Sequence, residues 1–291
     1  MRATALLVNG GFSSRELRHF YSGVQRRTPN EAGDTLAFEC LTMSLHNLSS
    51  IESLRQLNDP CPVVRSAIIA WYYAVYYAAK AMLAATSGTN PQNHAAACRS
   101  WQSEIVIRGL VREPFELHVS DITPQNVAAT IEALRSNNPY DLNAEPIDRD
   151  MALGALYSYL KGTASYERER LEQLVKDSSD FRHGGHTSFR SRAARDLRDA
   201  KLRPASVNYL VQAFRFRGKA NYRDAIYLSY GRNNTARLEQ FVSDLAVVSR
   251  AFVAMAAHYA SRRVVRDDWT LFIADIQENL QFGLPLSLDE I

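Results

Sequence analysis

Several features that mark common protein classes are missing from this sequence of 291 residues. Its three cysteines, Cys40, Cys61 and Cys98, form no Cys-x-x-Cys pair, which excludes a disulfide-stapled scaffold and a paired-cysteine metal centre. The chain also has no Walker-type glycine loop, no dinucleotide fingerprint and no Gly-x-Ser-x-Gly elbow. We therefore expect free thiols, no metal and no bound cofactor.

Lysine is scarce, because the 34 cationic residues comprise 29 Arg and only 5 Lys. Residues 181–237 hold 13 of these cations against Asp196, Asp199 and Asp224, which gives that segment a net charge of +10. The rest of the chain sums to −7, so the overall charge of +3 averages a basic segment with an acidic body. This asymmetry predicts a polyanionic or acidic partner.

Neither an export signal nor a membrane span is evident. The run after Met1 has a single Arg and is too short for a secretory core. The most apolar stretch, residues 67–85, carries Lys80 and five aromatic residues, which favours a buried core helix over a bilayer helix. We expect a cytoplasmic protein that makes no membrane contact.

Helical periodicity dominates the chain and predicts an all-α fold class. We expect an up-and-down helical bundle over residues 63–263, interrupted by an irregular, proline-rich insertion at 108–150. An N-terminal helical extension at 1–62 and a C-terminal tail helix within 264–291 complete the predicted organisation.

Two shorter features interrupt this pattern. Brief β-branched alternation predicts strands at Ile105–Leu110 and Phe115–Val119. Asn90, followed by Pro91, is predicted to cap the helix on which His94 lies. At that helix start we expect His94 to bond a buried backbone group or a tyrosine.

Two parts of the chain resemble one known family. Residues 72–79 read Tyr-Tyr-Ala-Val-Tyr-Tyr-Ala-Ala, and residues 90–94 read Asn-Pro-Gln-Asn-His. Residues 215–223 read Arg-Phe-Arg-Gly-Lys-Ala-Asn-Tyr-Arg. The combination resembles the HEPN superfamily, whose bundles carry a Tyr-Tyr-Ala-x-x-x-Ala-Ala helix, a Pro-x-x-His helix start and an Arg-x-x-Ala-Asp-Tyr segment. The resemblance covers residues 63–107 and 178–263.

The resemblance implies a dimeric module of the kind found in toxin-antitoxin and phage-defence systems. Many members are metal-independent ribonucleases that use an Arg-x4-6-His motif, since RNA cleavage needs proton transfer and cationic stabilisation of the phosphate. In this chain Arg223 is followed by Leu228 where that histidine is expected, and then by Tyr230. We therefore expect an RNA- or nucleotide-binding homodimer whose catalytic histidine is missing; a cognate protein partner is a further expectation.

The candidate contacts for RNA or another anion are cationic or aromatic residues of the basic segment. They are Arg182, Arg190, Arg192, Arg195, Arg217, Tyr222, Arg223 and Tyr230. Arginine forks match phosphate oxygens and stack on bases, and interleaved aromatics are typical of single-stranded RNA surfaces. The alternative for these residues is a solvated helix face balanced by the acidic body.

Two other functions stay open at this stage. One is an active metal-independent endoribonuclease, in which Arg223 works with a non-standard histidine, namely His183, His186 or His94. The other is a scaffold bundle that binds an acidic protein partner and no RNA. His183 and His186 flank a Gly-Gly loop with no cysteine nearby, which makes a metal site there a weaker prediction than a basic loop.

The three functions predict different surroundings for the arginines. A cleft that gathers Arg190, Arg192, Arg217 and Arg223 with a histidine favours the enzyme. A cleft with arginine and tyrosine but no histidine favours binding, and arginines that are each paired with a carboxylate favour the scaffold.

Overall fold

The computed structural model describes residues 1–59, 61–135, 145–222, 235–283 and 286. The predicted all-α fold class is confirmed, because almost all of the regular structure is helical. The helices are α1 (Arg2–Val8), α2 (Ser14–Phe20), α3 (Glu31–Arg55), α4 (Val64–Ser87), α5 (His94–Trp101), α6 (Pro124–Arg135), α7 (Arg149–Lys176), α8 (Ser179–His183), α9 (Arg192–Leu202), α10 (Tyr209–Tyr222), α12 (Thr235–Arg263) and α13 (Arg266–Asn279).

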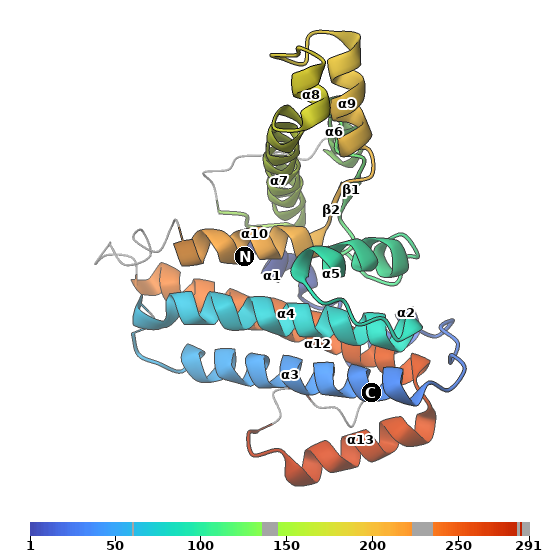
Figure 1. The fold of residues 1–291 in the computed structure, drawn as a ribbon. Coiled ribbons are helices and arrows are strands. Elements are labelled where there is room, and N and C mark those ends of the chain that lie inside the picture. Colours follow the sequence, from blue (N-terminus) through green and yellow to red (C-terminus); the bar gives the residue numbers. More distant parts are fainter. Residues whose placement is uncertain (60, 136–144, 223–234, 284–285, 287–291) are drawn as a thin grey trace.

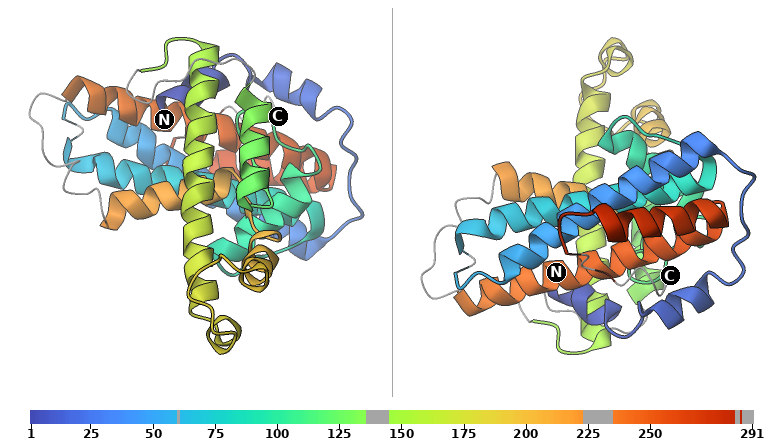
Figure 2. Two further views of the ribbon diagram at one scale, coloured as in Figure 1. Left: turned by 90° about the horizontal axis from the view of Figure 1, so that it is seen from above. Right: turned by 90° about the horizontal axis from the view of Figure 1, so that it is seen from below.

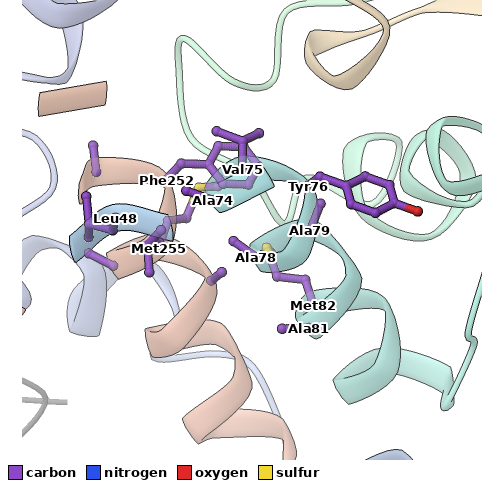
Figure 3. Close-up of a cluster of buried hydrophobic side chains, with 14 of the residues drawn as sticks. Leu48, Ala74, Val75, Tyr76, Ala78, Ala79, Ala81, Met82, Phe252 and Met255 are labelled. Atoms are coloured by element: carbon purple, nitrogen blue, oxygen red, sulfur yellow. The ribbon is translucent and has the colours of Figure 1, made fainter. Parts of the chain in front are cut away.

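The core of the bundle is formed by α3, α4 and α12, which lie side by side (Figure 1). The buried face of α4 is lined with small residues, of which Ala74, Ala78 and Ala81 have no exposed surface. Small side chains allow neighbouring helices to approach closely, and the larger Leu48 and Phe252 fill the remaining space (Figure 3). The alanine face of α4 therefore determines how closely three helices pack.

The other side of α4 carries aromatic residues. Trp71 packs edge-on against Phe216 of α10, with ring centroids 5.8 Å apart, and Tyr76 points away from the alanine cluster (Figure 3). The helix ends at Gly88, which has a φ of +73° that only glycine adopts without strain. A Cβ atom at Gly88 would also lie 2.7 Å from Nδ2 of Asn30, so a larger residue there would have to displace that side chain.

A projecting arm stands on the bundle. Figures 1 and 2 show α7 crossing the bundle, with α6 beside it and with α8 and α9 at its far end. A second hydrophobic cluster holds the arm together, and it includes Leu7 of α1, Ile131 of α6, Leu160 of α7 and Leu202 of α9. The insertion predicted at 108–150 thus supplies part of the core of the arm.

Of the two predicted strands, only one is present in part. The prediction of a strand at Ile105–Leu110 is wrong, because residues Gln102–Val106 form a π-helical turn, η2, that continues α5. This turn buries the β-branched side chains of Ile105 and Val106 in the bundle. The second survives only as β1 (Val119–Ser120), which pairs antiparallel with β2 (Ser206–Val207). These two strands are the only sheet in the part of the chain that the structure describes.

Arm and bundle are joined by buried polar side chains as well as by packing. Asn208, which has no exposed surface, donates from Nδ2 to the carbonyl oxygen of Cys98 at 3.0 Å and to Oε1 of Gln102 at 3.1 Å. Gln102 in turn donates to Oγ of Ser120 in β1 at 3.3 Å. Because buried polar groups without partners are costly, this chain of bonds fixes the start of α10 against η2 and β1.

One described helix, α12, is long and apolar enough over Ala236–Arg263 to cross a membrane. However, 78% of its most apolar window is buried inside the protein. This burial follows from the packing of α12 against both α3 and α4.

We predict that Ala78→Leu destabilises the protein by about 1–3 kcal/mol, because the added methyl and methylene groups have no space between α4 and its neighbours. Urea unfolding followed by circular dichroism measures the change. Ala200→Leu, at an exposed position of α9, is the matched control and should change the free energy of unfolding by less than about 0.5 kcal/mol. Equal effects of the two substitutions would contradict the close packing of α4.

Candidate nucleic-acid and anion site

Three segments that are distant in the sequence meet on one side of the bundle. We call the six residues that meet there the His94–Arg217 cluster. They are Tyr72, Tyr73 and Tyr76 of α4, His94 of α5, and Phe214 and Arg217 of α10. The cluster joins the three segments that carry the HEPN resemblance, which are the tyrosine helix, the helix start at His94 and the arginine segment of α10.

His94 is placed by the start of its helix. The side chain of Asn93 caps α5 by accepting a hydrogen bond from the backbone N–H of Ala96 at 2.9 Å, so the cap lies three residues after the predicted Asn90. Nδ1 of His94 lies 2.7 Å from the hydroxyl oxygen of Tyr72, which confirms the expected tyrosine partner. The imidazole also packs against Tyr76 and Phe214, with ring centroids 4.6 and 5.1 Å away.

The cluster keeps both partners of this hydrogen bond uncharged near neutral pH. Burial lowers the pKa of His94 below its ordinary value, and the positive charges of Arg217 and Lys80 lower that pKa further. Burial likewise raises the pKa of Tyr72, so its phenol stays protonated. In a neutral imidazole one nitrogen carries a hydrogen that it can donate, and the other can accept a proton. Because Nδ1 of His94 is hydrogen-bonded to Tyr72, Nε2 is the nitrogen that is left to contact a ligand.

Arg217 is held by aromatic rings rather than by a carboxylate. Its guanidinium carbon lies 4.9 Å from the ring centre of Tyr72, 5.2 Å from that of Phe214 and 5.9 Å from that of Tyr73. Nη1 donates to the hydroxyl oxygen of Tyr73 at 3.3 Å, and the buried Nε has no hydrogen-bond partner in the described residues. Stacking thus orients the guanidinium, and its charge has no counter-ion among the residues that the structure describes.

Four other predicted arginines lie on the arm tip, which we define as residues 179–195. They are Arg182, Arg190, Arg192 and Arg195, and all four are exposed. Arg182 lies 3.7 Å from Asp177, and Arg192 lies 4.0 Å from Asp196. Because both pairs are largely exposed, solvent screens them and they neutralise little of the positive charge.

Two further arginines of the basic segment have structural partners. Arg198 is largely buried, forms an ion pair with Asp199 at 2.8 Å and packs over the ring of Phe189. Arg215 stacks on Tyr166 at 4.4 Å and donates to Oγ1 of Thr163 at 3.0 Å, which ties α10 to α7. Part of the basic segment is therefore used to build the arm.

The histidines of the arm tip have no strongly defined site. His183 is exposed, whereas His186 packs edge-on against Phe181 at 5.4 Å, with Nδ1 3.4 Å from Oγ of Ser191. Among the residues described, no group of three or more His, Cys, Asp and Glu side chains could hold a metal ion. Arg223, Leu228 and Tyr230 lie outside the described residues, as does the side chain of Tyr222.

The structure divides the predicted site residues between two places. Arg190 and Arg192 lie at the far end of the arm, whereas Arg217 and His94 lie where α10 and α5 pack on the bundle (Figure 1). The sequence predicted a buried core helix over residues 67–85 and a backbone group or a tyrosine as the partner of His94, but not which tyrosine. The only available signal was the helical spacing of Tyr72, Tyr73 and Tyr76, because contact across 22 residues depends on the tertiary fold.

Comparison with known protein families, with curated proteins and with solved structures finds no match for this chain. Function is therefore inferred from the geometry of the two arginine surfaces and from the residues that surround them.

We predict that Arg217→Gln raises the pKa of His94 toward its ordinary value, because one of the two nearby positive charges is removed. NMR titration of the His94 imidazole signals measures the shift. Arg237→Gln, an exposed arginine of α12 outside the cluster, should leave that titration unchanged. A His94 pKa that does not respond to Arg217→Gln would show that the two side chains are not electrostatically coupled.

Proposed function

We propose that this protein is an RNA- or nucleotide-binding bundle of the HEPN type, and that it binds its ligand at the His94–Arg217 cluster. One observation carries the proposal: Tyr73 and Arg217, 144 residues apart, are hydrogen-bonded beside His94, so the three segments of the resemblance form one surface. The toxin-antitoxin or phage-defence setting implied by the resemblance belongs to the same proposal.

The chemistry of the cluster suits a nucleotide. Arg217 presents a guanidinium with no carboxylate partner in the described part of the chain, and such a fork donates two hydrogen bonds to a phosphate. Phe214, which is 40% exposed, and the half-buried Tyr73 offer ring faces beside it, on which a base can stack. A cation that is fixed next to aromatic faces is the combination that single-stranded RNA surfaces use.

A metal-independent endoribonuclease is the second candidate, because a neutral histidine lies in the same cluster as an unpaired arginine. Cleavage would join a ribose 2′-oxygen to the adjacent phosphorus and break the P–O5′ bond, which leaves a 2′,3′-cyclic phosphate and a 5′-hydroxyl, the 5′-oxygen taking its proton from the imidazolium or from water. Nε2 of His94 would take the 2′-hydroxyl proton, and Arg217 would stabilise the charge that builds on the phosphate. His94 would then carry out the proton transfer for which the side chain of Leu228 has no suitable group.

We predict that the protein binds single-stranded RNA, and that Arg217→Gln weakens this binding roughly tenfold or more, because charge-assisted hydrogen bonds to phosphate are lost. Phe214→Ala should weaken binding by about 5- to 100-fold through loss of base stacking. Fluorescence anisotropy with a labelled oligonucleotide, repeated over a range of salt concentrations, measures both effects.

Matched controls exist for both substitutions. Arg237→Gln removes an exposed arginine outside the cluster, and Phe20→Ala removes a phenylalanine of α2 that is exposed to 36%. Both should leave the dissociation constant within about twofold of the wild type. RNA binding that is absent, or that does not weaken as salt rises, would contradict the proposal, since phosphate contacts release counterions.

The second candidate predicts that purified protein cleaves RNA in the presence of EDTA and that His94→Gln abolishes the cleavage. In this mechanism Nδ1 of His94 carries the hydrogen and donates it to the Tyr72 oxygen; the glutamine amide retains an N–H donor for that oxygen but cannot transfer protons at neutral pH. The double variant His183→Ala/His186→Ala should remain active, because those histidines lie at the arm tip. Cleavage that persists in His94→Gln would rule out this mechanism, and RNA binding without cleavage would leave the binding function alone.

A further inference from the structure

A groove of about 1050 Å³ runs between α3 and α13, on the side of the bundle away from the arm (Figures 1 and 2). Its lining combines carboxylates with exposed apolar side chains. The lining includes Glu31, Glu39, Asp268 and Asp275, with Met43 and Leu271. Met43 is 41% exposed and Leu271 69% exposed, so the groove presents apolar surface as well as charge.

The charge of this α3–α13 groove is negative. No Lys or Arg side chain lines it within the residues that the structure describes, and its outer carboxylates form no ion pair there. Asp34, at its edge, is already paired with the buried Arg27 at 2.6 Å. The groove therefore accounts for part of the acidic body that the sequence predicted, and a complementary occupant is cationic.

The arm tip has the complementary character. Arg190, Arg192 and Arg195 are exposed around the start of α9, and Arg190 has no ion pair among the described residues. Ala193, in the first turn of α9, is also exposed and adds a small apolar surface beside these charges. A single helix of this kind is about 10 Å across, which suits a groove between two helices.

We infer that the arm tip of one copy of this protein docks into the α3–α13 groove of a second copy. The tip and the groove lie on opposite sides of the molecule, so they cannot meet within one chain (Figure 1). The contact joins two different surfaces and is therefore heterologous, which builds a ring or an open chain rather than a twofold dimer. Opposite charges align the two surfaces, and Leu271 and Met43 supply the apolar contact.

The first test uses nuclease-treated wild-type protein, so that RNA cannot bridge copies. Analytical ultracentrifugation should show species heavier than the 32.8 kDa monomer at about 50 mM NaCl, and these should dissociate toward monomers at about 500 mM NaCl, where charges are screened over a few ångströms. A protein that stays monomeric at low salt and at high concentration overturns the inference.

Two variants then test the contribution of each surface on its own. The tip variant is Arg190→Gln/Arg192→Gln/Arg195→Gln, and the groove variant is Glu39→Gln/Leu271→Ala/Asp275→Asn. Each alone should be monomeric, because one side of every contact is lost. An equimolar mixture should form pairs and stop there, since the mixture retains one working groove and one working tip. A twofold interface between like surfaces would give no such rescue, so failure of the mixture to pair overturns the head-to-tail arrangement.

Matched controls remove the same kinds of side chain elsewhere. Arg15→Gln/Arg99→Gln/Arg237→Gln removes three exposed arginines outside the tip, and Glu132→Gln/Ile147→Ala/Glu169→Gln removes two exposed carboxylates and one exposed apolar side chain outside the groove. Both should associate as the wild type does. If instead the tip variant loses RNA binding while its mass at low salt equals that of the wild type, the tip contacts RNA and the inference fails.

Discussion

The close packing of α4 against α3 and α12 is the constraint on which the rest of the molecule depends. Because Ala78 and its neighbours use one side of α4 for this contact, the tyrosines must emerge on the other side. That side is where α5 and α10 pack, so the same helix that fixes the core also supplies the ring faces around Arg217. The core and the candidate site are therefore built on two faces of the same helix, α4, residues 64–87.

The sequence predicted the helical class because apolar residues recur at helical spacing along most of the chain. It also predicted a buried backbone group or a tyrosine as the partner of His94, and the structure has the tyrosine. It could not predict that the basic segment divides between two places. The charge of a segment does not tell where its helices lie in space, and here α9 packs on α7 of the arm whereas α10 packs on α4 of the bundle (Figure 1).

The strand predicted at Ile105–Leu110 failed for a related reason. β-branched residues favour a strand when they alternate on an open surface, but here they continue α5 through a π-helical turn and enter the bundle core. Tertiary burial overrode local preference. The same burial shapes the candidate site, because it leaves His94 neutral and Arg217 without a counter-ion among the described residues, a state that suits recognition of a phosphate.

The arm has a mechanical consequence. α7 spans 28 residues, a length of about 42 Å at 1.5 Å per residue, and one end of it rests on the bundle through α1. A rigid rod of this length that tilts by about 5° at its base moves its far end by about 4 Å. The contact of Arg215 with Tyr166 lies ten residues before the C-terminal end of α7, so about 15 Å of one helix joins α10 to the arm tip. A tilt of α7 would therefore change where the arm tip lies relative to the His94–Arg217 cluster.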